Sequence, residues 1–153
     1  MEVIMVVDDD TTSVKVLRLA LEMRGHQIIE SSNPEDAIAR CLDKNQKVDM
    51  LIADVKMPGI SGTEVAMRIR EACTDMPILF ISGTPLEGWR REDLDNARAL
   101  LAEPIDFLQK PFTVDSLFAK VENLFRSRGP VPDFVAMLGA AEVFRQMRQD
   151  PLA

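Results

Sequence analysis

Residues 3–10 read Val3-Ile4-Met5-Val6-Val7-Asp8-Asp9-Asp10, an apolar run that ends abruptly in three aspartates. A run of this length, rich in β-branched residues and bounded by polar ones, is typical of a buried strand. It is too short for the apolar core of a signal peptide, and no later run approaches membrane-spanning length. We therefore expect a soluble, cytoplasmic chain without a membrane partner, whose first strand ends in acidic residues.

Four further runs of the same kind occur along the chain, at Gln27–Glu30, Met50–Ala53, Ile78–Ile81 and Phe107–Leu108. Longer segments with helical periodicity separate them, and this alternation favours a parallel sheet. Because crossovers between parallel strands are right-handed, the helices should cover both faces. The predicted fold class is α/β, a doubly wound five-stranded parallel sheet.

The helical segments are marked by apolar spacing and by capping residues. The first should span Ser13 to Arg24, with Thr11 or Thr12 as cap and Gly25 as its stop. The second should begin at Ser32-Asn33-Pro34-Glu35. The inward residues expected of the later helices are Val65, Ile69 and Ala72; then Leu94, Ala97, Leu100 and Leu101; then, between Thr113 and Arg128, Leu117, Phe118, Val121, Leu124 and Phe125.

A break at Gly129-Pro130-Val131-Pro132 separates the last of these helices from a C-terminal extension. We expect one domain over residues 1–128 and an extension over 129–153. The extension should form one amphipathic helix that runs up to Asp150-Pro151. Its apolar stripe, which could pack on the domain or form a homodimer, consists of Phe134, Met137, Ala141, Phe144 and Met147.

Composition narrows the function classes. The chain has 153 residues, 46% of them hydrophobic, which is enough for one domain with a real core. Its net charge is −7 and its Lys and Arg residues are scattered, which argues against direct binding of nucleic acid. The two cysteines, Cys41 and Cys73, lack the spacing of a metal site and are expected to be free thiols.

Polar residues follow several of the predicted strands. Asp8 and Asp9 follow the first, Asp54 the third, Ser82 the fourth and Lys110 the fifth. In a doubly wound sheet the carboxyl ends of the strands form the ligand site, so these side chains should converge there. Each aspartate alone could be an ordinary cap or loop residue. Together, three carboxylates repel one another unless a cation neutralises them, and an all-oxygen ligand set favours Mg²⁺.

The same residues lie in four blocks that resemble the signature blocks of response-regulator receiver domains, over residues 2 to about 126. The blocks are Val6-Val7-Asp8-Asp9-Asp10, Asp54-Val55-Lys56-Met57-Pro58-Gly59, Ile81-Ser82-Gly83 and Lys110-Pro111-Phe112. The resemblance implies a flavodoxin-like receiver fold, here with an extra C-terminal helix. It also implies a phosphorylation-dependent switch of a two-component phosphorelay, of the stand-alone, single-domain type.

Carried over position by position, the resemblance makes Asp54 the phosphoacceptor. It implies that Asp9 binds Mg²⁺ directly, that Asp8 helps partly through water, and that the backbone carbonyl of Lys56 completes the protein ligands. The ammonium of Lys110 would offset charge on the transferring oxygens.

Two further positions belong to the switch that the resemblance implies. The Ser82 hydroxyl would donate a hydrogen bond to the phosphoryl group and draw the following loop inward. Phe107 matches an aromatic position that changes rotamer, although it could equally be an ordinary core residue. The Lys110–Pro111 bond resembles a cis peptide of the family. Asp10 is expected to act at a helix N-terminus rather than as a metal ligand.

One segment departs from the family pattern. The chain between Ser82 and Lys110 is a few residues longer than usual and carries Glu87-Gly88-Trp89-Arg90-Arg91. In receivers the face built from the fourth helix, fifth strand and fifth helix commonly contacts the output partner. The change indicates either an unusual partner or a harmless surface insertion.

The phosphodonor is expected to be a partner histidine kinase or phosphotransfer protein, because the single His26 lacks any kinase context. The protein should assist its own phosphorylation and dephosphorylation without being a turnover enzyme. A degenerate receiver that serves as a protein-binding scaffold is one alternative, but the acidic residues and the lysine are all retained. A Mg²⁺-dependent phosphohydrolase is another, yet it needs an aspartate two residues after the nucleophile, where this chain has Lys56.

Overall fold

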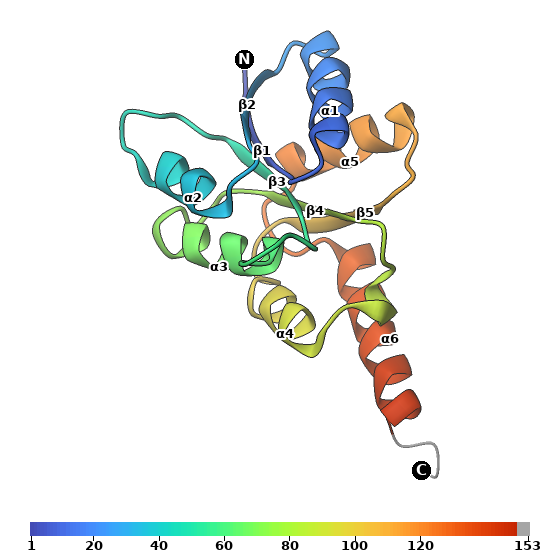
Figure 1. Cartoon of the computed structure of the whole chain (residues 1–153). Helices are drawn as coiled ribbons and strands as arrows, with labels where there is room; N and C mark the ends of the chain where they lie inside the picture. Colours follow the sequence, from blue (N-terminus) through green and yellow to red (C-terminus); the bar gives the residue numbers. More distant parts are fainter. Residues whose placement is uncertain (150–153) are drawn as a thin grey trace.

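The computed structural model describes residues 1–149 and is built on one five-stranded parallel sheet (Figure 1). The strands lie in the order β2-β1-β3-β4-β5. Their bounds are β1 Val3–Val7, β2 Gln27–Ser31, β3 Met50–Asp54, β4 Ile78–Ser82 and β5 Ile105–Gln109. All five predicted strands are confirmed. The first has the predicted bounds, the next three each run one residue further, and β5 is three residues longer than predicted.

Helices cover both faces of the sheet (Figure 1). Their bounds are α1 Thr11–Met23, α2 Pro34–Leu42, α3 Gly62–Ala72, α4 Arg91–Ala99, α5 Val114–Arg126 and α6 Pro132–Gln149, with a short 3₁₀ turn, η1, at Leu86–Gly88. Helices α1 and α5 lie on one face, and α2, α3 and α4 lie side by side on the other. The doubly wound α/β class predicted from the alternation is confirmed.

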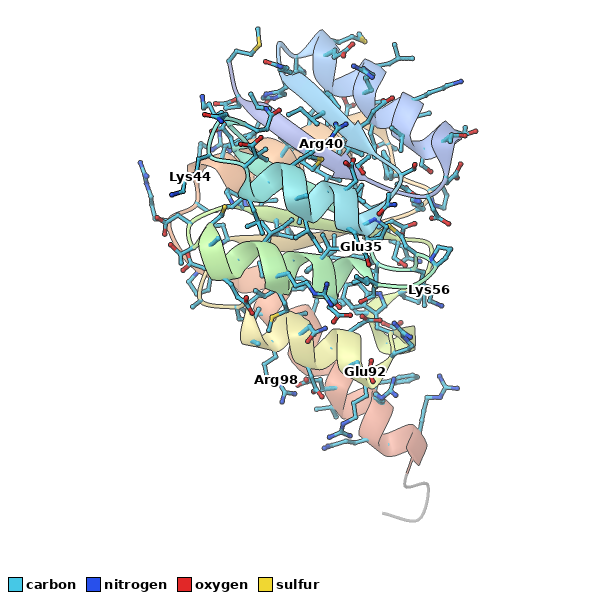
Figure 2. All side chains as sticks on the ribbon, turned by 60° about the vertical axis from the view of Figure 1, so that its left-hand side comes forward. Glu35, Arg40, Lys44, Lys56, Glu92 and Arg98 are labelled. Carbon is cyan, nitrogen blue, oxygen red and sulfur yellow. The ribbon has the colours of Figure 1, made fainter. Side chains whose placement is uncertain are left out.

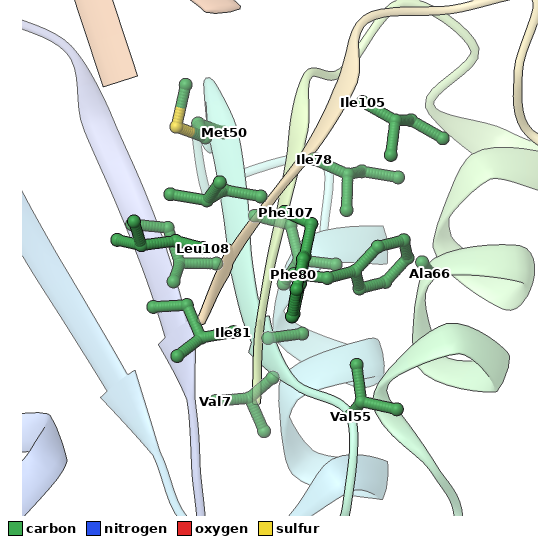
Figure 3. Packing of buried hydrophobic residues seen from close by; sticks show 14 of the residues in the cluster. Val7, Met50, Val55, Ala66, Ile78, Phe80, Ile81, Ile105, Phe107 and Leu108 are labelled. Atoms are coloured by element: carbon green, nitrogen blue, oxygen red, sulfur yellow. The ribbon is translucent and has the colours of Figure 1, made fainter. Parts of the chain in front are cut away.

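The core lies on both sides of the sheet. Strands β1, β3 and β4 are buried along their whole length, as expected for parallel strands covered by helices. Figure 3 shows part of this packing, with Phe80 on β4 pointing toward Ala66 of α3. Figure 2 shows the opposite pattern on the outer surface of α2 and α4, where Arg40, Glu92 and Arg98 point away from the body. The rigid sheet therefore fixes the relative positions of residues at its carboxyl edge.

Capping residues set the starts of the helices. The Asp10 side chain accepts a hydrogen bond from the Thr12 N–H and caps α1, which confirms the helix N-terminal role expected of it. Thr11 and Thr12 were predicted as caps, but they lie inside the first turn because Asp10 already fills that role. Asn33 caps α2 with Pro34 next to it, and Gly25, at φ 87°, follows the end of α1.

The predicted buried faces of the later helices are mostly confirmed. Val65 and Ile69 of α3, and Leu94, Ala97 and Leu100 in and after α4, are buried. Leu101 is only partly buried, and Ala72 is exposed because it lies in the last turn of α3, so its predicted inward position was wrong. On α5 the residues Leu117, Val121 and Leu124 are buried, whereas Phe118 and Phe125 are only partly so. The ring of Phe118 lies under the Arg24 guanidinium at 4.2 Å, and that of Phe125 stacks on His26. These aromatics therefore cover the rim of the core rather than filling its centre.

Helix α6 forms as predicted, but the face that it buries against the domain differs from the predicted stripe. Phe134 and Ala141 of the predicted stripe are buried, together with Val131 and Leu138. Met137, Phe144 and Met147 are exposed. Helix α6 contacts η1, α4 and β5 along the side of the helix that holds Leu138, and these three residues lie largely outside that contact. The predicted stop at Asp150-Pro151 lies outside the described residues.

Among residues 1–149, none of the helices is both long and apolar enough to cross a bilayer.

Candidate functional site

Three carboxylates meet at the carboxyl edge of the sheet. Asp54 is the last residue of β3, and Asp8 and Asp9 follow β1, which pairs directly with β3. One oxygen from each of the three side chains lies within 4.8 Å of the other two. Asp8 and Asp54 are buried, whereas Asp9 is exposed, so the cluster opens toward solvent on one side. The structure thus brings together the acidic residues that the sequence placed at separate strand ends.

Lys110 supplies a positive charge to this cluster. It follows β5, and its Nζ lies 3.0 Å from Asp8 Oδ2 and 3.5 Å from Asp54 Oδ2. Its backbone N–H donates a hydrogen bond of 2.9 Å to the Ser82 carbonyl, which ties the loop after β5 to the end of β4. The Lys110–Pro111 peptide is cis, as the resemblance implied. One ammonium group is therefore shared between two buried carboxylates.

Burial and mutual repulsion change the protonation of these groups. Desolvation, followed by the charge of Asp8, raises the pKa of Asp54 to about 6, although Lys110 opposes the shift. Partial burial by itself would lower the pKa of Lys110. The hydrogen bond to Asp8 and the charges of Asp54 and Asp8 together outweigh burial, so that pKa lies above its usual value. The site therefore holds a stable ammonium beside a carboxylate that is easily protonated.

The donor set fits a hard divalent cation. All three clustered side chains offer carboxylate oxygens, and no other group of three acidic, histidine or cysteine ligands is found among residues 1–149. One ammonium against three carboxylates leaves a negative surplus that a divalent ion would offset. Lys56, whose carbonyl was predicted as a further ligand, lies in the loop two residues after Asp54. Asp8, Asp9 and Asp54 are thus the side chains that could hold such an ion.

The loop after β4 adjoins the site. Ser82 ends β4, is buried, and its Oγ accepts a hydrogen bond of 3.1 Å from the Thr84 N–H. The Oγ accepts this bond, so its own proton remains available to a second acceptor. Phe107 is buried on β5, and its ring meets the Trp89 indole edge-on, with centroids 5.2 Å apart. The predicted switch residues therefore lie in and beside one hydrogen-bonded loop.

Four residues near the site had no role assigned from the sequence: Gly62, Thr63, Trp89 and Asp93. Gly62 begins α3 against the backbone of Asp54, and Trp89 is fully buried beneath the loop after β4. The buried Asp93 of α4 accepts a hydrogen bond of 2.5 Å from Thr63 Oγ1 of α3. The only signal for Trp89 was its place in an unusually long connection. Gly62 looked like an ordinary turn residue, and nothing in the sequence pairs Thr63 with Asp93.

A parallel sheet in the order 2-1-3-4-5, with clustered carboxylates and a lysine at its carboxyl edge, defines a receiver-type switch protein. Comparison with known families agrees, because residues 4–122 match the response regulator receiver domain. The chain belongs to the response regulator receiver domain family, whose members act in phosphorylation-dependent signalling and are phosphorylated on aspartate.

Among curated relatives, the chain is similar to the phosphate regulon transcriptional regulatory protein PhoB of Pseudomonas aeruginosa, at 30% identity over 129 residues. That alignment covers 83% of this chain and 53% of PhoB. The nisin biosynthesis regulatory protein NisR of Lactococcus lactis is 33% identical over 150 residues, which cover 96% of this chain and 58% of NisR. The chain thus spans a little over half the length of these regulators.

Solved structures agree with this assignment. The response regulator TrrA of Thermotoga maritima, crystallised in complex with Mg²⁺ and BeF, is 32% identical, with a TM-score of 0.68 over 81% of this chain and 99% of TrrA. A CheY-like receiver domain protein of Methanospirillum hungatei gives a TM-score of 0.71 over 82% of this chain and 94% of its own, at 19% identity. The second likeness shows the fold alone.

Proposed function

We propose that this protein is a phosphorylation-controlled signalling module in which Asp54 accepts the phosphoryl group. The observation that carries the proposal is the position of Lys110, whose Nζ lies within 3.5 Å of both Asp8 and Asp54 at the carboxyl edge of the sheet. A carboxylate beside an ammonium and two more carboxylates has the parts needed for in-line phosphoryl transfer. A partner histidine kinase or phosphotransfer protein would supply the phosphoryl group.

Asp8, Asp9 and Asp54, with the backbone carbonyl of Lys56, would hold Mg²⁺. When bound, the ion would neutralise the carboxylates and the developing charge on the transferring oxygens. The fit is supported by the all-oxygen cluster within 4.8 Å, and TrrA, to which the chain is similar, was crystallised with Mg²⁺. Asp9, the exposed member, would be the one reached first from solvent.

The protein's own residues would position the phosphoryl group and neutralise the charge on its oxygens. Asp54 is the nucleophile: one of its oxygens forms a bond to phosphorus while the bond between phosphorus and the donor's leaving atom breaks. Lys110 would move its ammonium from the Asp8–Asp54 pair toward a phosphoryl oxygen. The Ser82 hydroxyl, whose proton is not used by the bond from Thr84, would donate to another phosphoryl oxygen. Phe107 would respond by changing its packing.

Intact mass measurement tests the proposal. Purified protein is incubated with acetyl phosphate and Mg²⁺, alongside the Asp54→Ala variant and a sample with chelator. We expect one phosphoryl adduct that hydroxylamine removes, and only in the wild-type protein with Mg²⁺. If Asp54→Ala gains the same adduct, Asp54 is not the acceptor. If neither protein gains mass at any donor concentration, the chain acts as a protein-binding scaffold instead.

A further inference from the structure

Helix α6 occupies a face of the domain that the rest of the fold leaves apolar. Phe134, Leu138 and Ala141 are buried against η1, α4 and β5. An ion pair between Arg98 of α4 and Glu142 of α6 adds a polar contact along the same side. Figure 1 shows α6 running alongside α4, beneath the end of the sheet that holds β5. Helix α6 therefore packs on the domain along its buried row, and its last turns extend past α4 (Figure 1).

A continuous chain of hydrogen bonds joins this helix to the phosphoacceptor edge. The Ser82 Oγ accepts from the Thr84 N–H at 3.1 Å, and the Thr84 carbonyl accepts from Trp89 Nε1 at 3.0 Å. The Trp89 carbonyl in turn accepts from the Arg145 guanidinium of α6. Three successive hydrogen bonds thus connect the end of β4 to the outermost described turns of α6.

Trp89 cannot move independently of its surroundings. Its side chain is fully buried and meets the ring of Phe80 edge-on at 5.9 Å and that of Phe107 at 5.2 Å. Because protein interiors are close-packed, such a side chain shifts between discrete arrangements rather than by small continuous displacements. A displacement of Thr84 must therefore either break its bond to the indole or move Trp89 as a unit.

We propose that α6 is an intramolecular latch on the α4–β5 face, and that phosphorylation of Asp54 weakens its docking through Ser82, Thr84, Trp89 and Arg145. This inference rests on the proposed function, in which Ser82 is drawn toward the phosphoryl group. Thr84 follows Ser82, so its carbonyl withdraws from the Trp89 indole and leaves a buried donor to find another partner. The resulting shift of Trp89 moves the carbonyl that holds Arg145.

The contact of α6 with the domain leaves an apolar groove open on one side. A groove of about 370 Å³ remains between η1, β5 and α6, lined by Leu86, Phe107, Met137 and Phe144 among others. Met137 and Phe144 are each more than two-fifths exposed although they border this groove. Docking therefore depends mainly on one buried row of α6, on the Arg98–Glu142 ion pair and on the Arg145 contact to Trp89. A rearranged Trp89 would change the last of these.

Hydrogen exchange combined with intact mass measurement tests the latch. The full chain is incubated with Mg²⁺ and acetyl phosphate, and the adduct on Asp54 and the amide exchange of residues 132–149 are measured in the same sample. We expect faster exchange of α6 in the phosphorylated protein. An adduct with unchanged or slower exchange in α6 overturns the latch but leaves the proposed function standing. No adduct on Asp54 overturns both.

Linkage supplies a second test, because a coupling between two sites acts equally in both directions. Arg145→Ala removes the contact to Trp89 and should tighten binding of beryllofluoride with Mg²⁺ by about fivefold or more. Arg148→Ala is the matched control, because Arg148 is exposed on the same helix and its guanidinium lies over the Phe144 ring. Equal affinities of Arg145→Ala and wild type would refute the latch.

The Trp89→Phe variant keeps an aromatic ring in the core but loses the indole donor to Thr84 and part of the buried ring volume. We expect it to tighten beryllofluoride binding in the same direction as Arg145→Ala and to speed amide exchange in α6 without phosphorylation. Circular dichroism of each variant checks that the domain is folded. A folded Trp89→Phe protein with wild-type affinity and exchange would show that the indole hydrogen bond carries no coupling.

Discussion

Gly62 lies directly against the backbone of Asp54. A Cβ atom at position 62 would lie 2.1 Å from the Asp54 carbonyl oxygen and 2.8 Å from the carbonyl carbon. The Gly62 N–H also donates a hydrogen bond of 3.1 Å to the Val55 carbonyl. Helix α3 can therefore begin close behind Asp54 only because residue 62 has no side chain.

The substitution Gly62→Ala should destabilise the protein by about 2 to 3 kcal/mol, because the methyl group overlaps backbone atoms that cannot turn aside. Urea unfolding measures the change. Gly139→Ala is the matched control, because Gly139 is exposed on α6 and a Cβ there meets nothing within 4 Å. That control should be neutral or stabilising by up to about 1 kcal/mol. Equal stabilities of the two variants would contradict the close approach.

Replacing Asp54 with Asn should stabilise the domain in the absence of divalent ions. The folded pKa of about 6 lies above the usual value of 3.8, so the charged carboxylate disfavours the folded state above pH 6. The penalty disappears as the pH falls below the unfolded pKa, where both states are protonated. We expect Asp54→Asn to gain about 1 to 3 kcal/mol at pH 7.5 and almost nothing near pH 3.5.

Urea unfolding at the two pH values, with and without Mg²⁺, measures this gain. Mg²⁺ should reduce the difference, because it stabilises the wild-type cluster more than the variant. Asp75→Asn makes the same chemical change at an exposed position and should stay within about 0.5 kcal/mol of wild type. A variant that is less stable than wild type at pH 7.5 would show that Lys110 already offsets the repulsion.

The strands and their terminal residues could be predicted because they depend on local information. Parallel strands covered on both faces need continuous apolar runs, and Val3–Val7 and Ile78–Ser82 provide them. Once the sheet is parallel, topology alone places Asp8 and Asp54 at one edge. The caps at Asp10 and Asn33 act within three residues, so they too can be recognised in the sequence.

Features that depend on tertiary packing could not be predicted in this way. Trp89 stands among charged residues, yet its indole is buried because η1 folds it under the loop after β4. On α6 the apolar residues surround much of the helix, so the periodicity cannot decide whether Leu138 or Met137 faces the domain. The Thr63–Asp93 bond joins residues thirty positions apart, a pairing that no local pattern encodes.

Removing the Lys110 ammonium should impair phosphorylation more than folding. In Lys110→Met the charge that faces Asp8 and Asp54 is lost while the aliphatic stem remains. We expect the adduct on Asp54 to form at least about tenfold more slowly with acetyl phosphate and Mg²⁺, because the charge on the transferring oxygens loses a stabilising cation. Lys44→Met, at an exposed position seen in Figure 2, should react like wild type. Equal rates would remove Lys110 from the mechanism.

The contact between α3 and α4 should depend on Thr63. Its Oγ1 donates a hydrogen bond to Asp93, and among the described residues the only other hydrogen-bond donor to that buried carboxylate is Arg90 Nε at 3.3 Å. Thr63→Val has nearly the same shape but leaves the carboxylate short of a donor. We expect a loss of about 1 to 3 kcal/mol in urea unfolding, whereas Thr11→Val, at an exposed position, should change little. A neutral Thr63→Val would mean that water replaces the lost donor.

The Cys41 thiol should be protected in the native protein. Burial, followed by the neighbouring Cys73, raises the pKa of Cys41 to about 12, so only about one thiol in ten thousand is ionised at pH 8. Because the thiolate is the reactive form, iodoacetamide should alkylate Cys41 far more slowly than a free thiol. The Cys73→Ser variant isolates this residue, and intact mass should show no label in the native protein and one label in guanidinium. Labelling of the native variant at the rate of a free thiol would mean that α2 opens locally, because a thiol held in the packing described here cannot ionise at that pH.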